Sequence, residues 1–343
     1  QNAFQNGLWN GPGTYTITGG QLLSATNGFT QAELNFSLFF GLAVDAYERT
    51  LISDNTPFDR GALNQREQRG RSVFEGKGKC VNCHNGPLLS SAAVPPRQPA
   101  ELIENMVIGD GGQALYDGGF YNIGVRPTFE DVGVGGKDDY GIPLSFTRQL
   151  VSGPRVDNFP DPQGGSLDRV AVDGAFKTPS LRNIALTAPY FHNGGEKSLR
   201  DVVVFYNRGG NRRGPNGDDT TGTGPLGQTP AAPNLGGSNL DADIESLGLS
   251  DTEIDDLVAF MKALTDRRVS CHKAPFDHPE LVVSNGSEPV AAGGRARDAR
   301  LRLVQVGRNG YPDAWCDPNT GDLFARNLIG GMLKPLASAA PPP

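Results

Sequence analysis

Residues 80–84 are Cys80-Val81-Asn82-Cys83-His84, and this stretch decides what kind of fold the chain can have. On one helical turn, the two thiols and the imidazole project from the same face. The thiols can then add to the two vinyl groups of one porphyrin while the imidazole reaches the iron. The motif therefore predicts one covalently attached haem c, with Cys80 and Cys83 as thioether anchors and His84 as the proximal iron ligand.

Two other chemistries use a Cys-x-x-Cys pair. A thioredoxin-like redox pair normally lies in a βαβ unit, and no such alternation of elements surrounds the motif. A structural zinc site needs two further ligands, which Cys271 and His272 could supply. The zinc alternative stays open on the residues alone, although the histidine directly after the second cysteine favours haem.

The cysteines also indicate the cellular compartment. Thioether attachment of haem follows export, so we expect the protein in the periplasm or outside the cell, and no signal peptide opens the given sequence. Cys271 and Cys316 remain as a predicted disulfide, which suits an oxidising compartment. Two free buried thiols are the alternative.

The composition argues against some partners. The 343 residues carry a net charge of −7 and no basic stripe that could neutralise phosphates, so we expect no nucleic-acid partner. No apolar run reaches the ~18 residues that a membrane-spanning helix needs. The 46 glycines and 26 prolines predict many loops, which an embedded cofactor would help to hold in place.

Apolar periodicity and capping patterns predict four helices, at residues 30–47, 64–74, 198–209 and 250–264. The first and the last open with capping boxes. The segments between the helices consist mostly of turn residues. We therefore expect a mainly α fold, namely a cytochrome-c-like haem domain with long irregular loops and insertions.

These elements divide the chain into three parts. Residues 1–62 form an N-terminal loop and helix, which we expect to continue an upstream segment or linker. Residues 63–268 form the haem domain, and residues 269–343 form an irregular C-terminal extension. Residues 212–237 and 273–302 exceed a minimal cytochrome fold, and we expect them to be ordinary surface loops or segments that dock onto a larger complex.

The ligand on the second face of the iron would decide what the haem can do. Methionine is the usual choice for electron transfer, but Met261 falls on the core face of the fourth predicted helix, which leaves Met106 as the methionine candidate. His272 and His278 lie in a proline-rich segment, where we expect surface or capping roles. Tyr206 lies on the inward face of the third predicted helix, and on the residues alone a hydrogen-bonded core phenol is simpler than iron ligation.

Several strings resemble the bacterial diheme cytochrome c peroxidase superfamily, which includes the MauG-type diheme enzymes. The resemblance extends over roughly residues 34–264. Its most specific part is the string FKTPSLRNIALTAPYFHNG at residues 176–194. The other matching strings lie at residues 76–84, 120–125 and 203–210.

Members of this superfamily have two cytochrome-c-like domains with one haem each, and the matching strings resemble the second, electron-transfer domain. The resemblance implies that Tyr206, 14 residues after His192, is the distal iron ligand, as the corresponding tyrosine is in MauG-type proteins. It also implies that His192 and Arg182 line the haem pocket or hold propionates. A calcium ion between the domains would use backbone oxygens of Thr187 and Pro189.

This chain has one Cys-x-x-Cys-His motif where the family has two. The first haem domain would then lie upstream of Gln1 or on another chain, or the protein is a specialised monohaem derivative. We expect the electron-transfer domain of a peroxidase-like oxidoreductase that reduces hydrogen peroxide with electrons from a small cytochrome c or cupredoxin. The alternatives are a monohaem accessory electron carrier in a larger complex and a five-coordinate haem peroxidase or oxygenase.

Overall fold

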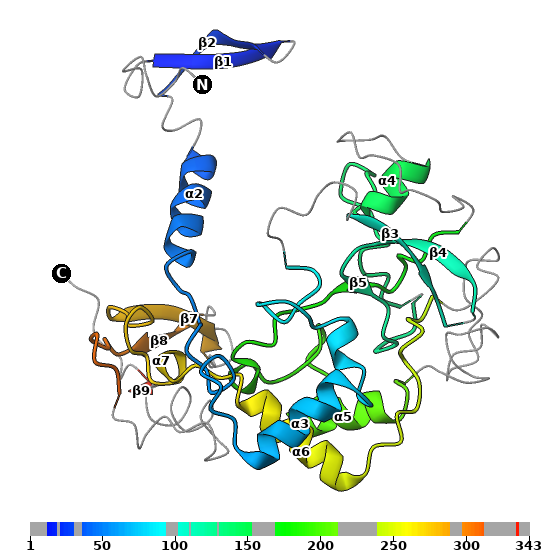
Figure 1. Ribbon diagram of the computed structural model, residues 1–343. Helices are drawn as coiled ribbons and strands as arrows, with labels where there is room; N and C mark the ends of the chain where they lie inside the picture. Colours follow the sequence, from blue (N-terminus) through cyan, green and yellow to red (C-terminus); the bar gives the residue numbers. More distant parts are fainter. Residues whose placement is uncertain are drawn as a thin grey trace.

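The computed structural model describes a helical core surrounded by small sheets (Figure 1). No helix among the described residues is long and apolar enough to cross a membrane. The residues described are 12–18, 21–30, 36–93, 102–109, 111–128, 130–152, 169–211, 239–288, 297–311 and 334–335.

Three helices form the core: α3 (Gln65–Glu75), α5 (Leu199–Asn207) and α6 (Asp251–Lys262). Their apolar faces meet around Phe260, which is 1% exposed and contacts the rings of Phe58 and Phe74 at centroid distances of 5.7 and 5.3 Å. Three of the four predicted helices are these three, because the apolar spacing that predicts them is also what packs them together.

Side chains at the starts of these helices bind the first free backbone N–H groups. Asn64 and Ser250 form complete capping boxes with Glu67 and Glu253 at the starts of α3 and α6. Ser198 accepts a hydrogen bond from the backbone N–H of Asp201 at the start of α5. These caps satisfy N–H groups that the helix itself cannot bond.

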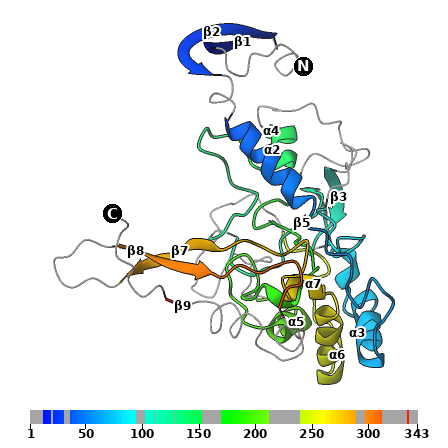
Figure 2. The same cartoon turned by 90° about the vertical axis from the view of Figure 1, so that its left-hand side faces the viewer.

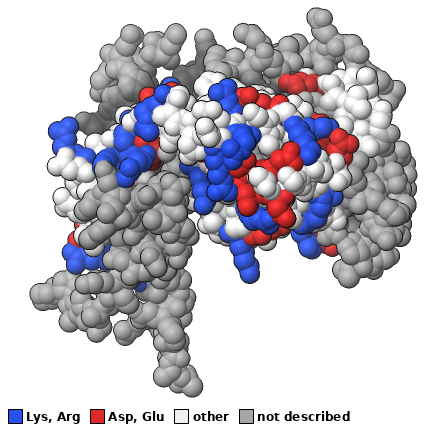
Figure 3. Space-filling view, turned by 60° about the horizontal axis from the view of Figure 1, so that its bottom comes forward, with Lys and Arg blue, Asp and Glu red and all other residues white. Residues whose placement is uncertain are grey.

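Helices α3 and α6 approach each other closely at Gly70. A Cβ at this position would lie 1.9 Å from the backbone oxygen of Asp256, so only glycine fits without movement. Beside this contact, the guanidinium groups of Arg66 and Arg69 bind the buried carboxylate of Asp256 at 3.3 and 2.7 Å. Figure 3 shows the outer face of the molecule here, where acidic and basic side chains alternate rather than gather by sign.

The expectation of a mainly α fold is not confirmed, because small sheets accompany the helices. Helices and short antiparallel sheets share the described residues, and none of these strands was predicted. One pair, β5 with β6, joins residues far apart in the sequence, where no local pattern could predict it. The strands are β1 (Pro12–Thr18) with β2 (Gln21–Thr30), β3 (Ile103–Val107) with β4 (Gln113–Asp117), β5 (Phe120–Tyr121) with β6 (Phe176–Lys177), and β7 (Leu281–Glu288) with β8 (Arg297–Leu303) and β9 (Lys334–Pro335).

The N-terminal helix α2 (Phe36–Glu48) lies between the β1–β2 hairpin and the rest of the molecule in both views (Figures 1 and 2). The predicted start of this helix at Thr30 is wrong, because Thr30 ends β2 and the described helix begins at Phe36; residues 31–35 lie outside the described residues. Residues just after α2 belong with the core: the backbone N–H of Phe58 donates to the carbonyl of Ala263, and the Phe58 ring packs on Phe260. The expected boundary at residue 62 therefore falls inside a continuous set of contacts.

The C-terminal part is less irregular than expected. It contains the short helix α7 (Arg267–Ser270) and the three-stranded β7–β8–β9 sheet, which includes much of the 273–302 segment. The 212–237 segment lies outside the described residues. Cys271 is fully buried and disulfide-bonded, whereas Cys316 lies outside the described residues, so its pairing with Cys271 stays a prediction.

Candidate haem site

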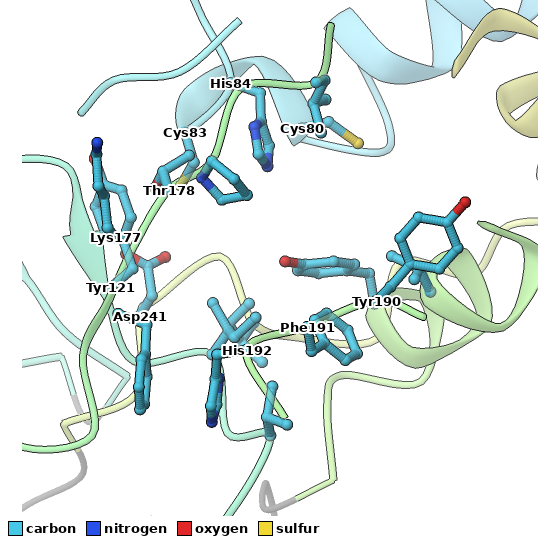
Figure 4. Close-up of a pocket in the computed structure, with 18 of the residues that line it drawn as sticks. Cys80, Cys83, His84, Tyr121, Lys177, Thr178, Tyr190, Phe191, His192 and Asp241 are labelled. Atoms are coloured by element: carbon cyan, nitrogen blue, oxygen red, sulfur yellow. The ribbon is translucent and has the colours of Figure 1, made fainter. Parts of the chain in front are cut away.

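A cavity of about 550 Å³ opens between the haem motif and the strings that carry the family resemblance. Its volume lies within the range of small-molecule and cofactor sites. Figure 4 shows Cys80, Cys83 and His84 on one side of the cavity and Phe191 and His192 on the opposite side. The donor set of two thiols and an imidazole around one largely apolar space fits a covalently bound haem c.

The segment that follows α3 places the cysteines beside this cavity. The backbone N–H of Gly78 donates to the carbonyl of Val73 at 2.7 Å, and Lys79 has a left-handed φ of 54° that turns the chain. A short 3-10 helix, Cys80–Asn82, follows, and the N–H of His84 closes the turn onto the carbonyl of Cys80 at 2.9 Å. The predicted helical turn is therefore present at the motif, and it places all three donors on the cavity side.

The imidazole of His84 is held by the backbone. Its Nδ1 lies 3.1 Å from the carbonyl oxygen of Leu89, the ring has a second hydrogen-bond contact with the backbone of Pro179, and burial lowers the pKa of the ring. When the neutral ring donates from Nδ1 to Leu89, Nε2 carries the lone pair. This arrangement is the usual support for a metal-bound histidine, because the backbone acceptor fixes both the tautomer and the ring orientation.

The two thiols do not have the properties of a reactive redox pair. Burial raises the pKa of Cys80 to about 12 and raises the pKa of Cys83 further. Catalytic dithiols have lowered pKa values instead. The zinc alternative also loses its ligands: Cys271 is disulfide-bonded, and no group of three His, Cys, Asp or Glu side chains that could hold a metal occurs among the described residues.

Tyr206 on α5 lines the same cavity. No residue in the described part of the chain hydrogen-bonds its hydroxyl, and burial raises its pKa far above the usual range, with a smaller effect of Cys83. By contrast, the nearby Tyr190 hydroxyl donates to the carbonyl of Ile184 at 3.1 Å. Tyr206 thus differs from Tyr190 in having no hydrogen-bond partner among the described residues, although a core phenol usually finds one.

The other candidates for the second iron ligand differ in whether they line the cavity. Met106 packs against the cluster around Ile108 and does not line the cavity, whereas Met261 lines it from α6. The ring nitrogens of His272 and His278 lie 3.0 Å from each other, and neither residue lines the cavity.

His192 lines the cavity, as expected from the resemblance. Its ring stacks on Phe176 with 3.6 Å between centroids, and its Nε2 lies 2.6 Å from a carboxylate oxygen of Asp131. These two contacts fix the imidazole plane. Thr187 and Pro189, the predicted backbone ligands of a calcium ion, also line the cavity.

The structure corrects the expectation for Arg182. The residue is not among those that line the cavity. Its guanidinium binds the carboxylate of Asp59 and the backbone carbonyls of Pro87 and Ser53. Arg182 therefore joins three segments of the chain and directs four of its five N–H groups to Asp59, Pro87 and Ser53 rather than into the cavity.

The sequence reasoning missed other residues of the cavity. Tyr121 lines it beside Cys83, and Lys79 at its edge forms ion pairs with Asp243 and Glu245. Tyr121 lies within residues 120–125, one of the strings that carry the family resemblance. Its place in that string is the sequence signal that could have identified it as a cavity residue. The acidic partners of Lys79 follow residues 212–238, which lie outside the described residues, and the sequence there offers no pattern.

Comparisons with known proteins agree with this site. The chain is 32% identical over 257 residues to cytochrome-c peroxidase IdrP1 of Denitromonas iodatirespirans, a match that covers 70% of this chain and 54% of that protein. It is 40% identical over 134 residues to the methylamine utilization protein MauG of Paracoccus denitrificans, covering 37% of this chain and 33% of that protein. No family model matches the chain.

Among solved structures, a MauG-like protein associated with microbial copper homeostasis aligns with a TM-score of 0.39 and 26% identity, over 65% of this chain and 55% of that one. The cavity and its donors fit a c-type cytochrome site. The sequence matches show that the chain belongs to the bacterial diheme cytochrome c peroxidase and MauG superfamily, a class of peroxidase-like oxidoreductases. The chain spans about half the length of the curated relatives that it matches most strongly.

Proposed function

We propose that this chain is the electron-transfer haem domain of a diheme peroxidase-like or MauG-like oxidoreductase, with His84 and Tyr206 as iron ligands. The observation that carries the proposal is the Tyr206 hydroxyl, which faces the cavity of His84 and has no hydrogen-bond partner in the described part of the chain. Tyr206 is half-buried against the cavity, and an iron ligand would supply a partner for its hydroxyl there.

Each residue has a defined task in this proposal. Cys80 and Cys83 anchor one haem c, which supplies an iron that cycles between ferric and ferrous states. The Leu89 carbonyl holds Nδ1 of His84 so that Nε2 points away as the ligand atom. Tyr206 gives its phenol proton to solvent and serves as a hard anionic donor, which favours the ferric state and lowers the potential relative to methionine.

The partners follow from the family. We infer that a second haem domain or chain reacts with hydrogen peroxide and that a small cytochrome c or cupredoxin supplies electrons. The proposed location is the periplasm or the outside of the cell, where haem attachment and the Cys271 disulfide are both compatible with the redox conditions. A calcium ion at the backbone of Thr187 and Pro189 is a further part of the proposal.

The ferric spectrum tests the iron ligands. We expect a low-spin His/Tyr spectrum in the haem-loaded protein and a five-coordinate high-spin spectrum in Tyr206→Phe. Tyr190→Phe removes a phenol of the same cavity whose hydroxyl is already bonded to Ile184, and Met261→Leu removes the methionine that lines the cavity, so both should keep the original spectrum. A Tyr206→Phe spectrum identical to that of the unchanged protein would refute the ligation.

Adding hydrogen peroxide to the unchanged protein then distinguishes the electron-transfer role from a five-coordinate peroxidase or oxygenase. No reaction by the isolated chain, together with peroxide turnover when a second haem domain is supplied, agrees with the electron-transfer role. A high-spin ferric spectrum and rapid reaction of the chain alone would instead support a five-coordinate peroxidase or oxygenase.

A further inference from the structure

Two tyrosine side chains in contact with each other connect the cavity with the β3–β4 hairpin. Tyr121 lines the cavity beside Cys83 (Figure 4), and Tyr116 on β4 lies directly behind it. The two ring centroids are 5.7 Å apart, with an angle of 37° between the planes. Tyr116 is only 6% exposed, so the pair forms a continuous aromatic contact from the cavity wall into the protein.

A carboxylate lies at the far end of this pair. Glu104 on β3 is the cross-strand partner of Tyr116, so both side chains project from the same face of the ladder. The Tyr116 hydroxyl donates a hydrogen bond to Oε2 of Glu104. Glu104 is only partly buried, so its carboxylate lies near the surface of β3, and Val107 on the opposite face of the same strand is 50% exposed.

A purely structural role for Tyr116 does not explain this arrangement fully. Packing alone needs only the ring, and a phenylalanine would fill the same volume without a polar group to satisfy. Instead, the phenol is buried and its hydrogen bond ends on a carboxylate, which can accept a proton. A phenol with a proton acceptor already in place can lose an electron without leaving a charged radical in an apolar site.

The geometry points to Tyr121 and Tyr116 as an electron relay between the haem cavity and the β3 surface, with Glu104 as the proton acceptor for Tyr116. The relay rests on the proposed function, because peroxide is the oxidant that makes the cavity haem able to accept electrons. In each electron-transfer event Tyr116 loses one electron through the Tyr121 ring to the oxidised haem, and its phenol proton moves to Oε2 of Glu104.

The products of that step are a neutral tyrosyl radical at Tyr116 and a neutral carboxylic acid at Glu104. An external one-electron donor at the β3 surface then reduces the radical, and the proton returns from Glu104 to the phenol oxygen. Two such electron-transfer events supply two electrons. Together with two protons from solvent, these electrons convert one hydrogen peroxide to two waters. The surface donor is a small redox protein or an oxidisable protein side chain.

A flash experiment on the haem-loaded full chain tests the relay without peroxide. A ruthenium polypyridyl photo-oxidant is attached to a cysteine that replaces Val107 on β3, and the haem is first reduced. After a laser flash, a sacrificial electron acceptor in solution takes one electron from the excited label, the oxidised label then takes an electron through Tyr116, and loss of the ferrous Soret band reports the rate at which the haem is oxidised. Tyr140→Phe is the matched control, because Tyr140 is 90% exposed and contributes nothing to the relay.

We expect Tyr116→Phe to slow haem oxidation about tenfold or more, Glu104→Gln to slow it less, and Tyr140→Phe to leave it unchanged. The rate in heavy water should fall for the unchanged protein and not for Glu104→Gln, since only the former moves a proton with the electron. Equal rates in Tyr116→Phe and Tyr140→Phe would overturn the relay. A purified protein without a Soret band would overturn the proposed function instead, so the two failures are distinguishable.

Discussion

The guanidinium of Arg182 binds the carboxylate of Asp59 through two parallel hydrogen bonds, each 2.9 Å long. Two further hydrogen bonds from Arg182 reach the carbonyls of Pro87 and Ser53 at 2.7 and 2.8 Å. The paired side chains are only 14% and 17% exposed. One side chain thus joins the segment after α2, the segment after the haem motif and the 176–194 string, and it keeps the wall of the cavity together.

Replacing Arg182 by lysine should therefore destabilise the fold. An ammonium group cannot form the bidentate pair, so the Arg182→Lys protein should lose roughly 1–3 kcal/mol of unfolding free energy. Arg49→Lys is the matched control, because Arg49 pairs with Asp45 at a highly exposed position and should change stability by less than about 0.5 kcal/mol. Urea unfolding of the haem-loaded proteins, followed by far-ultraviolet circular dichroism, measures both. Equal effects of the two substitutions would contradict the structural role of Arg182.

The same pair makes stability depend on acid pH. The hydrogen bond from Arg182 holds the pKa of Asp59 well below its ordinary value of 3.8. A carboxyl group with a lowered folded-state pKa stabilises the fold above the unfolded value, and this contribution disappears as the pH falls toward the folded value. Asp59→Asn should therefore be less stable than the unchanged protein at pH 7, and the difference should shrink below about pH 4. A difference that stays constant from pH 7 to pH 3 would contradict the lowered pKa.

Two glycines test the contact between helices α3 and α6. Gly70→Ala places a methyl group against the backbone oxygen of Asp256, so we expect a loss of roughly 1–3 kcal/mol or more. Gly41→Ala in α2 meets no atom within 4 Å, and the higher helix propensity of alanine should stabilise that helix by up to about 1 kcal/mol. Thermal unfolding followed at the helical dichroism band compares them. A Gly70→Ala protein as stable as the Gly41→Ala protein would show that the helices can move apart freely.

The parts of the fold that depend on neighbouring residues could be predicted from the sequence. Asn64, Ser198 and Ser250 cap α3, α5 and α6 at the expected positions, because a cap is formed by residues within one turn of each other. The strands could not be predicted in this way. Strand β5 pairs with β6 across more than fifty residues, and each is two residues long, too short to show an alternating pattern.

The candidate site likewise has residues that local sequence patterns predict and residues that they do not. The haem anchors Cys80, Cys83 and His84 are contiguous and follow from their spacing, whereas Tyr206 required the family resemblance. Arg182 was assigned to the pocket because it lies in the most specific string, but the direction of its side chain is set by Asp59, more than one hundred residues earlier. Sequence patterns identify segments that approach a cofactor, and tertiary contacts decide which side chains face it.

The last prediction concerns the proximal ligand. Because the Leu89 carbonyl fixes Nδ1 of His84, Nε2 is the atom that would bind iron, and a His84→Gly protein should keep its thioether-bound haem while losing this ligand. Its ferric spectrum should change, and added imidazole should restore the original spectrum by occupying the vacated space. His192→Gly, which removes an imidazole held by Asp131 on the other side of the cavity, is the control and should give a spectrum that imidazole does not alter. An unchanged spectrum in His84→Gly would mean that the iron is held by another residue, and the geometry around Leu89 would then need a different explanation.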